Sequence, residues 1–125
     1  MAVTTEEIAV GDLTDEERYV LSRGLAEWGG PAHCTDALAA AMDFDNAAAL
    51  LVEARRLRPL IRSGQPLSRR DWRRALIATE IVFASDVFGS GGDWSTTTGF
   101  SDEDTIRILR SLQRKIARSV RIHQP

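Results

Sequence analysis

The sequence predicts an all-α fold, a single-domain bundle of four or five helices around a central buried helix at about residues 69–88. Two observations support this class. Residues that cap helix N-termini recur along the chain, and each is followed by apolar residues at helical spacing. No convincing strand pattern is present, because the best candidate, residues 81–83, lies within one of these capped helical patterns.

The central helix is predicted from its start signal and its apolar pattern. Ser68 and Asp71 form a capping box, and a glycine follows the last apolar residue. At about 100° per residue, two broad apolar faces result, made by Trp72, Ala75, Leu76, Val82, Phe83 and Val87 and by Ile77, Ile81, Ala84 and Phe88. A narrow strip around Arg74, Ala78 and Ser85 remains for solvent. A helix that is apolar on two sides is usually covered on two sides, so we place it at the centre of the fold.

The other helices are predicted from caps and stops. Their expected ranges are about 14–28, 36–42, 46–63 and 102–121, with caps at Thr14, Thr35, Asp45 or Asn46, and Ser101. Pro59 should kink the third of these helices or split it near residues 57–58. Residues 1–13 are predicted to be a partly ordered lead-in, which leaves residues 14–125 as a single helical domain.

Composition favours a soluble globular protein. Hydrophobic residues make up 43% of the 125 residues and charged residues 27%, which is ordinary for one such domain. The single cysteine, Cys34, excludes an intrachain disulfide and fits a reducing cytoplasm. No apolar run approaches the roughly 20 residues that span a bilayer, and the acidic N-terminal segment lacks the basic region of a signal peptide. We expect a cytoplasmic protein without a membrane partner, and the excess of arginine over lysine suggests a bacterial genome.

Charge divides the chain into two halves. Residues 1–54 carry two basic and eleven acidic residues, a charge of −9, whereas residues 55–125 carry fourteen basic and seven acidic residues, a charge of +7. The two values give the net charge of −2. Such asymmetry indicates either an anionic partner or two halves of one domain that neutralise each other.

Motifs for nucleophilic or metal chemistry are absent. His33 lies beside Cys34, and adjacent residues rarely form a productive nucleophile–base pair. Asp43 and Asp45 open like a calcium loop, but alanines follow where further oxygen ligands and a glycine are required. Two histidines and one cysteine offer no zinc spacing. We therefore expect neither a metal nor a cofactor.

Residues 89–100 form the most unusual loop. Its first four residues, Gly-Ser-Gly-Gly, follow a helix rather than a strand and lack the lysine of a P-loop, which favours a helix exit over a phosphate site. A loop of about twelve residues in a small domain is often functional. Two alternatives stay open. The loop is a partner-binding surface, or its aromatic residues fill the core; the binding residues would be Asp93, Trp94, Thr96, Thr97 and Phe100.

Two acidic side chains are predicted to be buried on the central helix. Glu80 lies between its apolar faces and Asp86 at the edge of one face. A buried carboxylate requires a partner, so we expect an ion pair with an arginine or, alternatively, a functional acid in a pocket. An enzyme that uses Glu80 with Asp86 or Asp93 and the 89–100 loop is the third functional reading.

A nucleic-acid-binding regulator is the second reading. Arginines crowd the segment between residues 55 and 74, and the proposed contacts are Arg55, Arg58, Arg62, Arg69, Arg70 and Arg73. A helix, a short turn and an arginine-rich helix start loosely imitate a helix-turn-helix. Against this reading, the net charge is negative and the second helix is apolar on two sides, which suits a DNA groove poorly.

The C-terminal half supports the first reading, a non-enzymatic protein-binding protein. The segments ATEIVFASD (78–86), GSGGDW (89–94), TGFSDE (98–103) and LQRK (112–115) resemble small bacterial immunity proteins of polymorphic or contact-dependent toxin systems. The resemblance implies a cytoplasmic immunity or antitoxin protein that binds and blocks one toxin domain. A nuclease toxin would be met by the acidic half, including Glu16 and Glu17, whereas an acidic or membrane-acting toxin would be met by the arginines. In either case opposed charges would steer the association, and the sequence leaves both alternatives open. Oligomeric state is left open.

Overall fold

The computed structural model describes residues 6–30 and 32–122 and confirms the all-α fold class. Its elements follow in the order β1 (Glu7–Ile8), α1 (Asp15–Glu27), α2 (Asp36–Ala41), α3 (Ala47–Arg62), β2 (Leu67–Ser68), α4 (Arg69–Ala84), the 3₁₀ turn η1 (Gly91–Asp93), α5 (Trp94–Thr98) and α6 (Asp102–Ile122). The predicted lead-in, residues 1–13, is described only from Glu6 onward, and residues 1–5 lie outside the described part.

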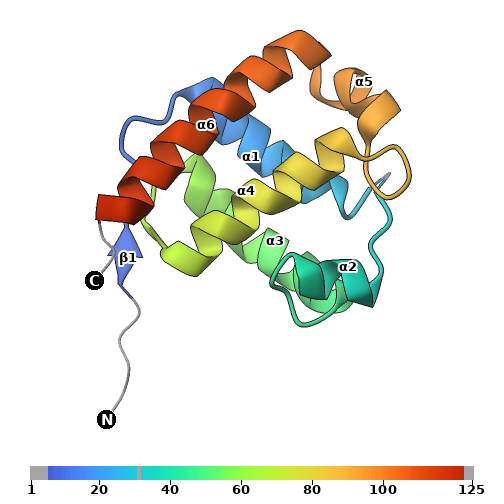
Figure 1. The fold of residues 1–125 in the computed structure, drawn as a ribbon, viewed down its shortest axis with the longest axis horizontal. Helices are drawn as coiled ribbons and strands as arrows, with labels where there is room; N and C mark the ends of the chain where they lie inside the picture. Colours follow the sequence, from blue (N-terminus) through green and yellow to red (C-terminus); the bar gives the residue numbers. More distant parts are fainter. Residues whose placement is uncertain (1–5, 31, 123–125) are drawn as a thin grey trace.

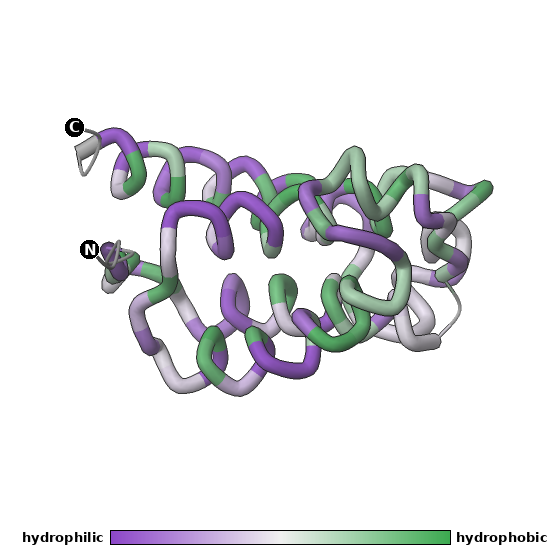
Figure 2. Tube along the Cα trace, turned by 90° about the horizontal axis from the view of Figure 1, so that it is seen from below, coloured by the Kyte–Doolittle hydropathy of each residue, from purple (hydrophilic) through white to green (hydrophobic). Residues whose placement is uncertain are grey.

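The helices form two layers. Figure 1 shows α4 and α6 side by side in front, with α1 and α3 behind them and α2 below. Figure 2 shows these layers from below, with hydrophobic and hydrophilic residues alternating along the helices. Helix α1 packs most extensively against α3 and α4, so the core lies between the layers. Its fully buried members include Leu21, Leu25, Leu50, Leu57 and Leu112.

Five predicted helix starts are confirmed by their hydrogen bonds. The side chains of Thr14, Thr35, Asn46 and Ser68 accept from the backbone N–H three residues later. The Ser101 hydroxyl does the same for α6. Helix α3 runs without a break through Pro59, so the predicted split does not occur. An N-cap side chain bonds a backbone N–H only two or three residues later, so helix starts can be predicted from the sequence without knowledge of the fold.

A small antiparallel ribbon was not predicted. Ile8 pairs with Leu67 and Glu7 with Ser68, and the Trp72 indole N–H donates to the Ile8 carbonyl at 2.7 Å. Two-residue strands carry no periodic pattern, so the sequence could not show them. The ribbon fixes the N-terminal segment against the start of α4.

Helix α4 is central, as predicted, but it ends at Ala84 rather than near residue 88. Ser85 adopts an extended conformation and its hydroxyl accepts from the Phe88 N–H. The chain then reverses, and Ser90 donates its N–H to the Val82 carbonyl at 2.7 Å. Val87 is therefore 76% exposed instead of buried, and Phe88 is exposed as well.

The solvent strip of α4 also differs from the prediction. Ala78 is fully buried and Arg74 is 8% exposed, whereas Arg70 and Arg73 face solvent. Helix α1 covers Ala78, because the Trp28 indole N–H donates to the Ala78 carbonyl at 3.1 Å. The helical pattern alone could not show which side α1 occupies.

Candidate functional site

Trp94 belongs to the core. Its side chain is 0% exposed, its indole N–H donates to the Thr105 hydroxyl at 2.8 Å, and its ring meets Phe83 edge-on with centroids 5.7 Å apart. The tryptophan opens helix α5, which the predicted loop contains. Of the two alternatives for this residue, the core position is the one in the structure, so Trp94 is not an accessible contact.

The other predicted loop contacts differ in exposure. Asp93, Thr96 and Thr97 face solvent, and the Thr97 hydroxyl donates back to carbonyls of its own turn. Phe100 is half-buried, with its ring 5.7 Å from that of Tyr19. The exposed part of this segment is small and polar, without an aromatic anchor for a partner.

The two acidic residues predicted for a toxin contact lie in different environments. Glu16 is exposed, whereas Glu17 is only 3% exposed, which corrects its assignment as a surface contact. The Lys115 ammonium donates to the Glu17 carboxylate at 2.7 Å. Burial alone would raise the pKa of Glu17, but hydrogen bonds from Lys115, Ser111 and Thr14 lower it below its usual value. Glu17 is a structural residue that joins α1 to α6.

The prediction that Glu80 and Asp86 are both buried on α4 is wrong for Asp86. Asp86 is exposed, because the helix ends before it. Glu80 is half-buried, and its carboxylate accepts a hydrogen bond from the Gln113 amide of α6 rather than from an arginine. Glu80 lines a cavity beside α2, which neither Asp86 nor Asp93 lines. The residues of the enzyme reading therefore do not share this cavity.

Ion pairs connect the acidic and the basic half of the chain. Among the described residues, five pairs cross the boundary between residues 54 and 55, and they are Arg56–Glu53, Arg74–Glu53, Arg70–Asp43, Lys115–Glu17 and Arg118–Asp12. Part of the charge division is thus neutralised within the fold, which is one of the two alternatives that the sequence left open.

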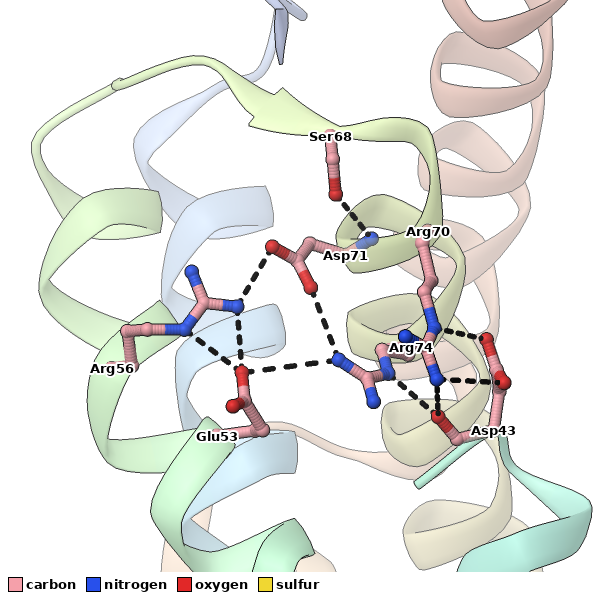
Figure 3. A network of polar contacts seen from close by, with 7 residues as sticks. All are labelled: Asp43, Glu53, Arg56, Ser68, Arg70, Asp71 and Arg74. Carbon is pink, nitrogen blue, oxygen red and sulfur yellow. Dashed lines mark hydrogen bonds and ion pairs between the residues drawn. The ribbon is translucent and has the colours of Figure 1, made fainter. Parts of the chain in front are cut away.

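The densest of these contacts lie between α3 and α4 (Figure 3). Arg56 pairs with Glu53 at 2.6 Å and with Asp71 at 2.8 Å, and Arg74 lies 3.4 Å from Asp71. The hydrogen bond to Asp71 raises the pKa of Arg56 above its ordinary value. The network borders a cavity of about 400 Å³ whose lining holds three acids and three arginines. Because Glu53 and Asp71 pair with Arg56 and Arg74, we interpret the network as a structural junction.

Asp43 extends the network to α2. Its φ of 73° places it in the left-handed region, and its carboxylate accepts from Arg70 at 2.9 Å and 3.2 Å. The hydrogen bond from Arg70 lowers the pKa of Asp43. The Asp43 carbonyl accepts from Arg74 at 2.7 Å, and the Arg74 guanidinium lies 4.7 Å above the Phe44 ring.

The network interrupts the arginine patch of the nucleic-acid reading. Arg56, Arg70 and Arg74 engage carboxylates of their own chain. Arg55 and Arg62 lie exposed on α3 with Arg58 half-buried, while Arg69 and Arg73 belong to α4. The crowded arginines therefore do not act as one free cationic surface.

A groove along α4 was missed by sequence reasoning. Its first part, about 400 Å³, lies between α2 and α4 and is lined by Met42, Leu76 and Ile77 among others. Its second part, about 280 Å³, lies between α4 and α6 and is lined by Arg73, Leu76, Ile116, Ala117, Val120 and Arg121. The two parts share Arg73 and Leu76, so we describe them as one outer groove.

The charge of the outer groove is uneven. The α4–α6 part contains two arginines and no acid. Neither Arg73 nor Arg121 forms an ion pair with the described residues. In the α2–α4 part, Asp43 and Glu80 already accept hydrogen bonds from Arg70 and Gln113. An apolar floor with uncompensated cations remains open to a partner.

Comparison with protein-family models, with curated proteins and with solved structures gives no match for this chain. Within residues 6–30 and 32–122, no cluster of His, Cys, Asp and Glu is suited to hold a metal ion. None of the helices in this part of the chain is long and apolar enough to cross a membrane.

Proposed function

We propose that this chain is a protein-binding domain that receives its partner in the outer groove along α4. One observation carries the proposal: the central helix of the fold leaves Leu76 and Ile77 half-exposed between α2 and α6, beside an apolar floor from α6. Elongated apolar grooves between helices are a common docking site for an amphipathic helix of a partner.

The charges of the groove favour an acidic partner. A carboxylate on the docking helix would meet Arg73 or Arg121, whose guanidinium groups form no ion pair with an acid among the described residues. Exposed cations at the rim of an interface chiefly raise the association rate and select partners of opposite charge. The cations that the proposal assigns to the partner therefore belong to the basic half of the chain, while residues at the end of α2 complete one wall of the groove.

An immunity or antitoxin protein is the most concrete form of this proposal. The resemblance of the C-terminal half to small immunity proteins is consistent with a cytoplasmic protein that blocks one toxin domain by binding it. The groove residues on α4 and α6 belong to the same half of the chain. In this form, the blocked toxin would present an acidic helix.

The test compares two single substitutions. Ala117 is exposed and lines the groove, so Ala117→Glu would fill the groove and lower its positive charge without removing a core side chain. The control is Val52→Glu on α3, where the side chain is 60% exposed and lines neither part of the groove. The wild type and both variants are coupled to a resin and exposed to native lysate with and without nuclease.

The expected result is a protein retained in stoichiometric amount by the wild type and by Val52→Glu, with or without nuclease, and lost with Ala117→Glu. Equal retention by all three proteins would contradict the groove as the docking site. Recovery of nucleic acid that disappears with nuclease and with added salt would instead support the regulator reading.

A further inference from the structure

A second groove lies between α1 and α3. It has a volume of about 430 Å³, and its charged lining consists of Arg23 from α1 and Arg55 and Arg58 from α3, without an acid. Its walls include Leu25, Ala26, Leu51 and Ala54. The cavity at the ion-pair network, by comparison, balances three arginines with three acids.

The three arginines are differently engaged. Arg55 is exposed and makes no hydrogen bond or ion pair with any described residue. Arg58 donates through Nε to the Ser22 hydroxyl at 3.4 Å, and its terminal nitrogens have no partner among the described residues. Arg23 is held by Glu27 at 2.9 Å, which leaves about two uncompensated positive charges around the groove.

The C-terminal end of α1 borders this groove, and its carbonyl groups could in principle repel an anion. A helix C-terminus carries exposed carbonyls and a partial negative charge, which would oppose an anion. Here the Ala26 carbonyl accepts the N–H of Gly29, and the Glu27 carbonyl accepts those of Gly30 and Ala32. Because these carbonyls are already hydrogen-bonded, the guanidinium groups dominate the local charge.

We propose that the α1–α3 groove binds a small organic molecule that carries a phosphate group. Guanidinium groups bind phosphate through paired N–H donors. The negative charge of one phosphate or diphosphate group would balance the roughly two uncompensated positive charges of the groove. The volume lies in the range of small-molecule pockets, which is roughly 300–1,000 Å³. The apolar wall at Ala26 and Leu51 would contact the remainder of the molecule. This site is separate from the outer groove and does not depend on the proposed protein partner.

The experiment uses pyrophosphate and adenosine diphosphate as probes, titrated into the whole isotope-labelled chain at a constant ionic strength of about 0.1 M, where the Debye length is about 10 Å. The backbone amides of Gly29, Gly30 and Leu51 report on the groove by nuclear magnetic resonance. The variants are Arg55→Ala and Arg114→Ala. Both remove one exposed arginine that forms no hydrogen bond or ion pair with a described residue, but Arg114 lies on α6 and does not line the groove.

Saturable shifts confined to the groove amides are expected with both probes, and adenosine diphosphate should bind more tightly because the apolar wall adds contact. Arg55→Ala should weaken binding roughly tenfold or more, because a hydrogen-bonded charge contributes about 1.5–3 kcal/mol. Arg114→Ala should leave affinity within about twofold, since screening weakens a distant charge.

Failure of both probes to give saturable shifts would overturn the proposal. So would equal weakening by the two variants, because diffuse attraction to a basic surface would then explain the binding. A single-stranded oligonucleotide provides the third arm. If it binds more tightly than adenosine diphosphate and shifts amides along α6 as well, the groove is part of a nucleic-acid surface and the small-molecule site is refuted.

Discussion

Replacement of Trp94 by alanine should destabilise the whole fold. The side chain is fully buried, packs edge-on against Phe83 and donates its indole N–H to Thr105. Removal of a buried tryptophan side chain typically costs about 3–5 kcal/mol through lost burial and the cavity left behind. For a domain of this size, each kcal/mol lowers the melting temperature by about 3–5 °C. We therefore expect the melting temperature to fall by about 9–25 °C in thermal denaturation followed by circular dichroism.

Trp94→Phe separates the hydrogen bond from the packing. It keeps an aromatic ring but removes the donor to Thr105, whose hydroxyl also donates to the Ser101 carbonyl at 2.8 Å. We expect a smaller loss of about 1–2 kcal/mol. A melting temperature for Trp94→Ala within two degrees of the wild type would refute the core role. Reduced partner binding by a fully folded Trp94→Ala protein would restore the surface reading of the 89–100 loop.

Three further predictions concern helix junctions. Glu17→Gln should reduce the loss of stability in acid, measured by urea denaturation at a series of pH values. The pKa of Glu17 is lower in the folded than in the unfolded state, so its carboxylate stabilises the fold fully above the unfolded-state pKa. That contribution is lost as the pH falls through the folded-state pKa, and glutamine has no such contribution to lose. Gly24→Ala should destabilise the fold by about 1–3 kcal/mol, because a Cβ would collide with the Thr79 side chain, and adding Thr79→Ala, which removes the colliding hydroxyl and methyl groups, should recover part of the melting temperature. Asp71→Ala should cost about 1–3 kcal/mol, because it leaves Arg74, which is 8% exposed, without its nearest carboxylate; an unchanged urea midpoint would contradict the structural role of the network.

Local chemistry explains what the sequence could predict. A hydroxyl or amide oxygen at Thr14, Asn46 or Ser68 acts on an N–H three residues away, so helix starts were readable directly. The end of α4 was not, because Val87 and Phe88 continue the apolar helical pattern while Ser85 and Ser90 redirect the backbone.

The candidate sites depend on contacts between distant segments. The sequence shows that Glu17 belongs to a capping box, but not that Lys115 lies 2.7 Å from its carboxylate. The outer groove likewise requires Leu76 of α4 to lie beside Ile116 of α6. Helical periodicity indicates which residues are apolar and leaves undetermined which neighbour covers them, so neither groove was predictable.

The ion pairs between the acidic and basic halves have a consequence for fragments of the chain. Gly64 and Gln65 lie in an exposed turn between α3 and α4, where a cut would separate α1–α3 from α4–α6. The two fragments would carry opposite net charges, and the contacts Asp12–Arg118, Glu17–Lys115 and Asp43–Arg70 would join them across the cut. The fold is thus suited to reassembly from two separately produced pieces, with a recombination rate that salt would slow.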